Sequence, residues 1–414
     1  MTLSKSNYKI CIIGLGYVGL PLATRFSLKG FDVLGFDINK TRVKDLRNSI
    51  DTNNDMGSNE IAKLLEGCKL SSNEEDLKDR NIYILTVPTP INEDKTPDLN
   101  PIIHSSELVG KYISKGSIVI YESTVYPGVT DDVCTPILEK ESGLVFNEDF
   151  FTGYSPERIV PGDKVNTIEK IKKVVSGSNQ KALDAVTHLY SSIIDAGIHQ
   201  APSIKIAEAS KVTENIQRDV NIALINELHQ MYALLGIDTH EVIEAASSKW
   251  NFMKLKPGLV GGHCISIDPY YLMHKSKMSG YYPDIMIKAR EVNEGMGDWV
   301  LSNFLGYIKQ NNIDLHSTNI TFLGYTFKEN CSDIRNTKVR ELILSVKDKG
   351  ANVSLWDPLL ELAELDNLES QGIKVYRTIP NDVQLAFLCV PHNEILEFLE
   401  VYKGPLFDYK KITH

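Results

Sequence analysis

The sequence predicts an α/β protein in which two doubly wound domains are joined by a long central helix. Two observations indicate the domains: a strand–turn–helix–strand pattern near the start of the chain, and a second such pattern near its end. A third observation indicates the helix, because apolar residues recur at helical spacing through one long segment between the two patterns. The chain of 414 residues is long enough for two or three domains.

The first pattern begins with an apolar run that predicts a strand over residues 8–13. A glycine-rich turn follows, and then a helix over 20–30 that ends at a glycine and a second strand over 31–36. Together they form a βαβ unit. Short apolar runs predict further strands at 82–87, 117–121 and 174–176. We therefore expect residues 1–200 to form the first domain.

The glycine-rich turn has the spacing GxGxxG, with Gly14, Gly16 and Gly19 between a strand and a helix. The first glycine permits a tight turn, the second lets the backbone approach a pyrophosphate, and the third lets the helix pack on the strand. Asp37 ends the second strand, where a carboxylate can bind a ribose hydroxyl and would repel a 2′-phosphate. We therefore predict a Rossmann-like domain that binds NAD rather than NADP; the alternative is a tight turn in a generic α/β domain.

The middle of the chain predicts one long helix over residues 203–235. Its apolar residues recur at helical spacing, at Val212, Ile216, Val220, Ala223, Leu224, Leu228, Met231 and Leu235. Gly236 is a plausible stop. Such a helix would extend for roughly 50 Å at about 1.5 Å per residue, which a small domain cannot bury. We expect it to be shared with a second subunit of a homodimer, within a central helical region at 201–300.

The last part of the chain repeats the layout of the first. A strand over 319–324 ends in a glycine, a helix follows over 337–350, and a strand over 352–357 ends in an acid. Another strand is predicted at 385–390. Any α/β domain could show this layout, but the recurring acid at the strand end favours a second nucleotide-binding fold at 301–414.

Composition excludes several classes of protein. Hydrophobic residues make up 42 % and charged residues 24 % of the chain, as in an ordinary globular protein. The net charge of −10 argues against nucleic acid as a partner, because phosphates need a basic face. The six cysteines form no CxxC pair, so we expect free thiols and no metal site. Without a signal-peptide core or a membrane-length apolar run, we expect a cytoplasmic protein with no membrane partner.

The segment 257–271 is the most unusual stretch, since three glycines and two prolines preclude regular structure and permit close approach of a ligand. Cys264 lies in it, whereas Cys11 and Cys389 lie in predicted strands and are expected in the core. A loop cysteine near a cation can act as a thiolate nucleophile. The alternative is an inert thiol.

The long helix carries a candidate cation for that thiolate. Lys211 and Asn215 are four residues apart and share a face, with Arg218 on the same side. A lysine beside an amide can polarise an alkoxide or take its proton. The alternative is a solvated stripe in which Glu214 pairs with Arg218.

Seven motifs in order resemble the UDP-glucose/UDP-N-acetylhexosamine 6-dehydrogenase family, over nearly the whole chain. They are Gly14–Gly19, Val87–Pro90, Glu122–Val125, Ser155–Arg158, Lys211 with Asn215, Gly261–Cys264 with Asp268, and Gly324–Lys328 with Asp333–Arg335. The resemblance implies two Rossmann-like domains joined by a long dimerising helix. It also implies that the carboxyl-terminal domain binds a UDP-sugar.

The resemblance implies a role for each matching residue. Cys264 is the nucleophile, while Lys211, Asn215 and Asp268 handle protons and stabilise the oxyanion. Thr124 and Glu157 hold the nicotinamide side and position the hydrolytic water. The implied substrate contacts are Arg158, Ile159, Lys211, Asn215, Arg218, Gly262, Phe327 and Lys328. The implied NAD contacts are Gly14, Gly16, Tyr17, Val18, Gly19, Asp37, Arg42, Thr89, Thr124 and Arg335. Structural alternatives are that Thr124 only ends a strand, that Glu157 pairs with Arg158, and that Arg335 pairs with Asp333.

The implied reaction is a four-electron oxidation of the sugar's C6 alcohol to a carboxylate through a thiohemiacetal and a thioester on Cys264, with two NAD⁺ consumed. Ile267 precedes Asp268, where the UDP-glucose branch typically has lysine. Residues 154–163 and 249–252 also resemble the N-acetylhexosamine branch. We therefore favour UDP-N-acetylglucosamine, then the galactosamine and mannosamine epimers, then UDP-glucose, for capsule or O-antigen precursor synthesis.

Two other functions stay open. A two-electron β-hydroxyacid dehydrogenase also pairs a lysine and an asparagine on a central helix after a Rossmann domain, but it needs no cysteine. A non-catalytic NAD-binding protein would need neither. The number of NADH molecules formed per sugar separates the three.

Overall fold

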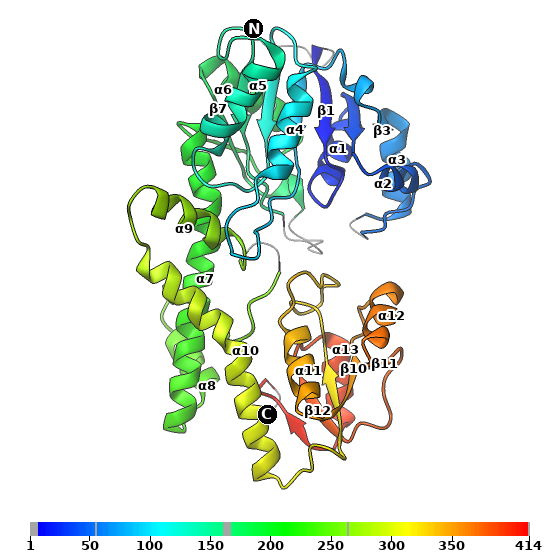
Figure 1. Ribbon diagram of the computed structural model, residues 1–414, viewed down its shortest axis with the longest axis vertical. Coiled ribbons are helices and arrows are strands. Elements are labelled where there is room, and N and C mark those ends of the chain that lie inside the picture. Colours follow the sequence, from blue (N-terminus) through cyan, green and yellow to red (C-terminus); the bar gives the residue numbers. More distant parts are fainter. Residues whose placement is uncertain (1–6, 54–55, 160–166, 263–264, 413–414) are drawn as a thin grey trace. The chain divides into compact units, whose positions relative to one another are not determined.

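The computed structural model describes residues 7–53, 56–159, 167–262 and 265–412 (Figure 1). Cys264, the predicted nucleophile, lies outside these described residues. Strands and helices alternate along most of the chain, so the predicted α/β class is confirmed.

The chain divides into two compact units. The N-terminal unit comprises Met1–Glu214 with Tyr270–Tyr281, and the C-terminal unit comprises Asn215–Pro269 with Tyr282–His414. The boundary therefore falls inside the long helix. The predicted division at residues 200 and 300 is a different one and stays a prediction.

The N-terminal unit contains an eight-stranded sheet in the order β3-β2-β1-β4-β5-β6-β7-β8. Its strands are β1 (Lys9–Ile13), β2 (Asp32–Phe36), β3 (Cys68–Ser71), β4 (Ile82–Leu85), β5 (Ile118–Tyr121), β6 (Phe151–Tyr154), β7 (Lys173–Gly177) and β8 (Ile198–Gln200). All neighbours are parallel except β6 and β7. The first six strands have the order of a doubly wound dinucleotide-binding sheet, in which ligands bind at the carboxyl ends where the strand order reverses.

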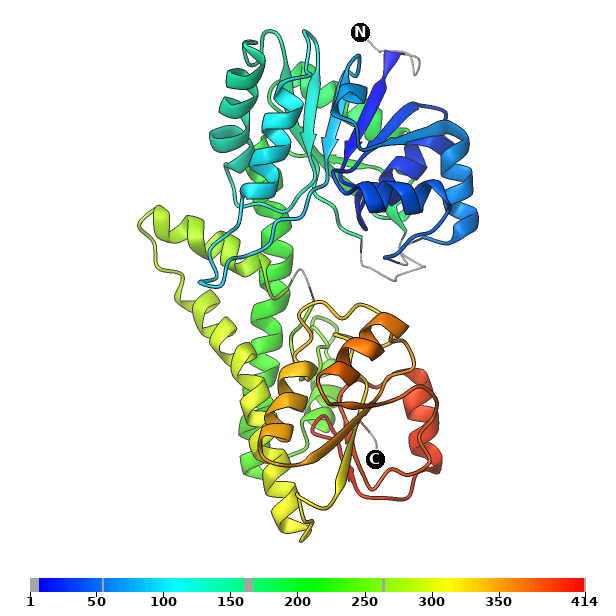
Figure 2. The same ribbon diagram turned by 45° about the vertical axis from the view of Figure 1, so that its right-hand side comes forward.

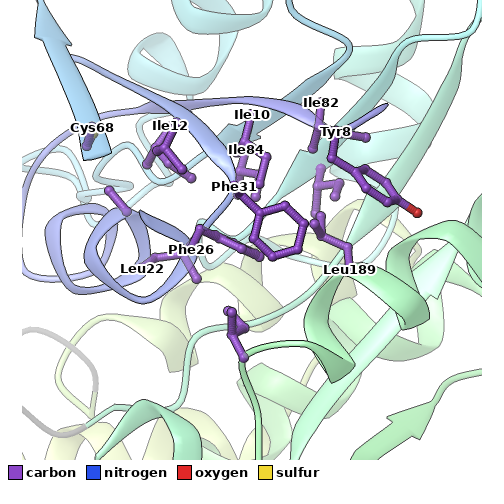
Figure 3. Close-up of a cluster of buried hydrophobic side chains, with 14 of the residues drawn as sticks. Tyr8, Ile10, Ile12, Leu22, Phe26, Phe31, Cys68, Ile82, Ile84 and Leu189 are labelled. Carbon is purple, nitrogen blue, oxygen red and sulfur yellow. The ribbon is translucent and has the colours of Figure 1, made fainter. Parts of the chain in front are cut away.

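Helices cover both faces of this sheet. They are α1 (Gly19–Leu28), α2 (Lys40–Arg47), α3 (Ser58–Gly67), α4 (Asn100–Gly110), α5 (Thr135–Ser142) and α6 (Gln180–Ser191). On one face, Ile10 and Ile12 of β1 pack with Leu22 and Phe26 of α1 and with Leu189 of α6 (Figure 3). On the other face, the hydroxyl groups of Tyr121 in β5 and Ser106 in α4 lie 2.8 Å apart. The alternation of side chains along each strand gives the sheet its two buried faces.

Helix α7 (Ile204–Leu235) has 32 residues, and the predicted long central helix is confirmed. Its first 11 residues, 204–214, belong to the N-terminal unit and the rest to the C-terminal unit. Val212 is fully buried, whereas Leu235 is 62 % exposed. The apolar periodicity that predicted the helix is therefore only partly explained by burial within this chain.

The C-terminal unit contains a second parallel sheet, in the order β11-β10-β9-β12-β13 (Figure 2). Its strands are β9 (Asn319–Leu323), β10 (Asn352–Trp356), β11 (Lys374–Tyr376), β12 (Leu385–Leu388) and β13 (Leu406–Phe407). The helices are α8 (Thr239–Ser247), α10 (Asp284–Gln310), α11 (Val339–Asp348), α12 (Leu362–Ser370) and α13 (Asn393–Val401). Phe304 of α10 packs against Phe322 of β9 and Phe387 of β12 in a buried core. The second Rossmann-like fold is confirmed.

Two features differ from the sequence predictions. Helix α9 (Asp268–Met278) begins inside the segment 257–271, so the prediction of irregular backbone is wrong from Asp268 onward. Proline is tolerated in the first turn of a helix, where its missing N–H has no partner to lose, and Pro269 stands there. The 27-residue helix α10 was not predicted. Within the described part of the chain, no helix combines the length and apolar character needed to cross a bilayer.

Candidate active site

The glycine-rich turn has the geometry of a dinucleotide loop. Gly14 has a φ of +94°, which favours glycine. A Cβ added to Gly16 would meet nothing within 4 Å, so a ligand can approach the backbone there. A Cβ added to Gly19 would lie 1.9 Å from the carbonyl oxygen of Gly14, so only glycine lets α1 start this close to the turn. These three glycines fit a pyrophosphate at a helix N-terminus.

Asp37 and Arg42 both hold the turn. One carboxylate oxygen of Asp37 accepts the N–H of Leu15 at 2.8 Å, and the other accepts the N–H of Asn39 at 2.8 Å. Arg42 is buried, donates from Nε to the Leu15 carbonyl at 3.0 Å, and forms an ion pair with Asp51. Both side chains therefore position the turn, whatever contact they also make with a ligand. Tyr17, Val18 and Thr124 are half-buried and Thr89 is buried; their predicted contacts stay predictions.

Three charged side chains meet at the ends of neighbouring strands β5, β6 and β7. Lys173 Nζ lies 2.8 Å from Glu122 Oε2 and 2.7 Å from Glu157 Oε2. Tyr190 donates a hydrogen bond to the other oxygen of Glu122. All four side chains are buried. We call this group the Glu122–Lys173–Glu157 network.

The two carboxyl groups of the network differ in their pKa values. Burial raises the pKa of Glu122 to about 7, against the attraction of the Lys173 ammonium. Burial also acts to raise the pKa of Glu157, but the Lys173 ammonium and two backbone N–H donors outweigh it, so the pKa of Glu157 falls below its usual value. Glu157 is thus the member held as a carboxylate.

Glu157 also fixes the backbone that follows it. Its Oε1 accepts the N–H groups of Arg158 at 2.6 Å and Ile159 at 2.7 Å. The Arg158 guanidinium does not pair with the Glu157 side chain: it binds both oxygens of Glu214 on α7, at 3.1 and 2.6 Å. Glu214 is therefore engaged by Arg158 and not by Arg218, which is exposed and has no ion-pair partner among the described residues.

Glu208 ties the start of α7 to the segment that follows the Glu122–Val125 motif. Its two oxygens accept the N–H groups of Gly128 and Thr130, at 2.5 and 2.9 Å. Burial raises the pKa of Glu208 to about 7, despite these hydrogen bonds. Lys211 lies one helical turn further along and is 8 % exposed. The described residues offer the Lys211 ammonium no ion-pair partner.

In the C-terminal unit, the structure brings Asn215 and Asp268 together. Asn215 Nδ2 donates to Asp268 Oδ2 at 2.6 Å, and both side chains are buried. Asn215 follows Lys211 by four residues on α7, so the two predicted catalytic side chains share one helix face.

Both flanks of residues 263–264 are anchored within the same unit. The side-chain amide of Asn226 on α7 makes two hydrogen bonds to the backbone of Gly258. It accepts the Gly258 N–H at 2.8 Å and donates to the Gly258 carbonyl at 3.0 Å. Gly262 donates its N–H to the carbonyl of Arg335 at 3.0 Å, and its own carbonyl accepts from Asn336 at 3.1 Å. Together with Asp268, these contacts hold the segments before and after Cys264.

A cavity of about 400 Å³ lies within the C-terminal unit. Among the described residues that line it are four lysines, Lys256, Lys328, Lys338 and Lys410, and one acid, Glu329. The predicted substrate contact Phe327 also lines it and packs against Gly262. The excess of positive charge suits an anionic ligand such as a diphosphate. Arg335 instead binds Asp333 with two nitrogens, so its predicted NAD contact stays a prediction.

The described cysteines are all buried, as expected for Cys11 and Cys389. Burial raises the pKa of the Cys68 and Cys134 thiols to about 12, and it also raises the pKa values of Cys11 and Cys389. None of these four thiols ionises near neutral pH. Cys264 and Cys331 are the remaining cysteines, and Cys331 is buried.

Sequence reasoning assigned no role to Glu122, Lys173, Glu208 or His392. Glu122 lies within the Glu122–Val125 motif but was given no role of its own. Lys173 is a charged residue at the start of an apolar strand, and this position was the one sequence feature that could have indicated a buried ion pair. His392, described below with the loop it contacts, gave no signal in the sequence.

Three parts of the chain match the domains of one family. Residues 8–194 match the NAD binding domain of the UDP-glucose/GDP-mannose dehydrogenase family, residues 205–295 its central domain, and residues 321–414 its UDP binding domain. The match is therefore continuous apart from short connecting segments.

Individual relatives agree with this match. Protein CapL from Staphylococcus aureus is 46 % identical over 420 residues, covering 99 % of this chain and 97 % of CapL. UDP-N-acetyl-D-glucosamine 6-dehydrogenase from Pseudomonas aeruginosa is 51 % identical over 354 residues, covering 85 % of this chain and 83 % of that protein. Among solved structures, UDP-D-ManNAc dehydrogenase from Pyrococcus horikoshii has a TM-score of 0.85 at 27 % identity, covering 98 % of this chain and 96 % of that one.

Proposed function

Because the chain belongs to the UDP-glucose/GDP-mannose dehydrogenase family, we propose that it oxidises the C6 alcohol of UDP-N-acetylglucosamine to the uronic acid. The predicted enzyme class and cofactor are confirmed by the matches: the protein is an NAD-dependent nucleotide-sugar dehydrogenase. The observation that carries the finer proposal is the hydrogen bond between Asn215 and Asp268, because it joins the helix of Lys211 to the residue four after Cys264.

The choice of sugar rests on the relatives and on one residue. Two relatives that are 51 % and 49 % identical are named UDP-N-acetyl-D-glucosamine 6-dehydrogenases, whereas those named for UDP-N-acetyl-D-mannosamine are at most 33 % identical among the relatives compared. Ile267 stands directly before Asp268, at the position where the UDP-glucose branch typically has a lysine. UDP-N-acetylglucosamine is the first substrate to test, and its galactosamine and mannosamine epimers and UDP-glucose follow.

The lysine-lined cavity is the proposed site of the UDP moiety. Lys256, Lys328, Lys338 and Lys410 supply charge for the diphosphate, and Phe327 offers an aromatic surface for the base. This assignment explains how a chain with a net charge of −10 can bind an anionic substrate.

The proposed chemistry assigns each step to a residue of the chain. Bound NAD⁺ supplies the hydride acceptor for both oxidations. As C6 of the sugar loses its first hydride, its hydroxyl proton passes to the group formed by Lys211, Asn215 and Asp268. Cys264 Sγ then bonds to the aldehyde carbon, and Lys211 with Asn215 stabilises the oxyanion. Loss of a second hydride from this carbon leaves a thioester.

Hydrolysis of the thioester completes the reaction. Water attacks the carbonyl carbon, the C–S bond breaks, and the Cys264 thiol and the sugar carboxylate are released. Glu157, which the network holds as a carboxylate, and Thr124 position this water in the proposal. Two NAD⁺ are consumed for each sugar.

The test is to incubate the protein with NAD⁺ and each of four UDP-sugars while NADH and the sugar product are measured. Two NADH per UDP-N-acetylglucosamine, with a carboxylate product, is the expected result. One NADH with an accumulating carbonyl would indicate a two-electron β-hydroxyacid-type dehydrogenase, and none with any sugar would indicate a non-catalytic NAD-binding protein. Faster turnover of an epimer would reassign the substrate.

Asp37→Asn is expected to weaken NAD⁺ binding by about tenfold to a hundredfold, the effect of losing a hydrogen bond to a charged group. The neutral side chain also no longer repels a 2′-phosphate, so the preference for NAD⁺ over NADP⁺ should shrink. Titration calorimetry with both cofactors measures the ratio. Asp45→Asn, on the neighbouring helix α2, is the matched control and should leave it unchanged; an unaltered ratio in Asp37→Asn would contradict the ribose role.

We also propose a homodimer formed through the α7–α8 region. Leu224, Leu234, Leu235 and Trp250 are 52 %, 90 %, 62 % and 92 % exposed, which leaves an apolar surface uncovered. Light scattering should give twice the 46.4 kDa mass of one chain. Leu234→Glu with Leu235→Glu should give the single-chain mass, whereas Leu362→Glu on α12 should not. A single-chain mass for the unaltered protein would end this proposal.

The product, a nucleotide-activated uronic acid, fits synthesis of a surface polysaccharide. The similarity to CapL supports a capsule precursor, and an O-antigen precursor is the second candidate. Location in the cytoplasm stays a prediction.

A further inference from the structure

His392 connects the strand-end acid of the second fold to the loop at 325–330. The imidazole is fully buried, as is the side chain of Asp357. Its Nε2 lies 3.0 Å from Asp357 Oδ2 and 3.1 Å from Thr326 Oγ1, and its Nδ1 accepts the N–H of Asn330 at 2.9 Å. Because Nδ1 is an acceptor, the ring proton is on Nε2, from which it is donated to Asp357.

Asp357 is more deeply buried than Asp37, the strand-end acid of the first fold. It is 4 % exposed, and its oxygens accept the N–H groups of Tyr325, Thr326 and Leu359 as well as the His392 donor. Because the carboxylate is buried and accepts these four hydrogen bonds, its oxygens are not accessible to a ribose hydroxyl. Its hydrogen bonds act on the loop instead.

Asp357 and His392 together form hydrogen bonds with both ends of the 325–330 loop. Asp357 binds its first two N–H groups, and His392 binds the last one, at Asn330. The Thr326 hydroxyl, which contacts His392, also donates to the carbonyl of Lys328 at 3.0 Å. Asn330 has a left-handed φ of 53°, a conformation that asparagine adopts more readily than most other residues.

The loop that these groups hold lines the lysine-lined cavity. Thr326, Phe327, Lys328 and Glu329 all line it, and Phe327 and Lys328 are the proposed substrate contacts. His392 itself does not line the cavity. We propose that His392 is a positioning residue, which sets the conformation of the 325–330 loop and thereby the affinity of the cavity for the UDP moiety. The proposal rests on the proposed function, because that function places UDP in this cavity.

The two nitrogens of His392 can be tested separately. Asn places its amide near Nδ1, so His392→Asn can keep an acceptor for Asn330 while losing Asp357. Gln places its amide near Nε2, so His392→Gln can keep the donor to Asp357 while losing Asn330. His392→Leu loses both. The exposed His316 lies in the same unit away from the cavity lining, so His316→Leu is the matched control.

UDP alone is the probe, since its binding depends neither on the sugar nor on turnover. His392→Leu is expected to weaken UDP binding to the full chain about tenfold, equivalent to 1.4 kcal/mol, with smaller losses in His392→Asn and His392→Gln. NAD⁺ affinity should not change. With substrate, KM for the UDP-sugar should rise while kcat at saturation is retained, a split that loss of folded protein would not produce.

Amide hydrogen exchange gives a second readout. In His392→Leu, exchange should accelerate at residues 325–330 and not throughout the sheet, and His392→Asn should spare the amide of Asn330. Equal UDP affinity in all three variants and the unaltered protein would overturn the inference. Failure of the unaltered protein to bind UDP would instead contradict the proposed function, so the two failures are distinct.

Discussion

Cys264→Ser is expected to lower the rate of uronic acid formation by roughly a thousandfold or more, because removing a covalent nucleophile generally has an effect of this size. An ordinary cysteine thiol has a pKa of about 8.5 and a serine hydroxyl does not ionise near neutral pH, so serine cannot supply the thiolate that adds to the aldehyde. Without that adduct, no thioester forms. The measurement is the yield of carboxylate per sugar, followed with the NADH count.

The control for this variant is Cys68→Ser. Cys68 is buried in β3, its pKa is raised to about 12, and its thiol donates to the carbonyl of Lys69, a hydrogen bond that a hydroxyl can replace. Cys68→Ser should therefore retain both oxidations. Carboxylate formation at an undiminished rate in Cys264→Ser would exclude the covalent pathway and favour direct oxidation of a hydrated aldehyde.

Lys173→Met should produce the largest loss of stability, about 3–5 kcal/mol, the usual result of removing one partner from a buried ion pair. The methionine fills the space of the lysine chain but leaves the carboxylates of Glu122 and Glu157 buried without their cation. Thermal unfolding measures the loss, at about 2–4 °C for each kcal/mol in a domain of 150–250 residues. Lys172→Met is the control, since Lys172 is the exposed neighbour in sequence.

The loss in Lys173→Met should depend on pH in a defined direction. Without the ammonium, the pKa values of Glu122 and Glu157 rise, because burial is then unopposed by a positive charge. A carboxyl whose folded-state pKa lies above its unfolded value contributes stability at low pH and loses it as the pH rises through the folded pKa. The deficit relative to the unaltered protein should therefore be smaller at pH 5 than at pH 8. A deficit that is the same at both values would contradict the charge-based explanation.

The fold could be predicted because its signals are local. A strand that runs into GxGxxG and a helix can form only a few structures, and the apolar spacing through 203–235 has the period of one helix face. No local sequence pattern predicted the hydrogen bond between Asn215 and Asp268. It joins residues 53 apart in sequence, and the resemblance to a family implied only a shared role for the two residues in handling protons and stabilising the oxyanion.

The supporting groups of the site could not be predicted, for a physical reason. Lys173 at the start of an apolar strand indicates a buried partner, but Glu122 lies 51 residues away and only the order of β5, β6 and β7 brings them together. The recurring acid at the strand end, Asp357, predicted only a second nucleotide-binding fold. No local sequence pattern predicts that His392 encloses it, because this contact depends on how the loop after β12 folds back.

Helix α7 also limits how the length of this chain can vary. Successive residues of an α-helix are rotated by about 100°, so one residue inserted between Lys211 and Asn215 would turn these side chains away from each other. Glu208 and Asn226 are bound to backbone on either side of that point, so the helix could not rotate to compensate without breaking one of them. Insertions and deletions in natural variants should therefore be absent from 208–226.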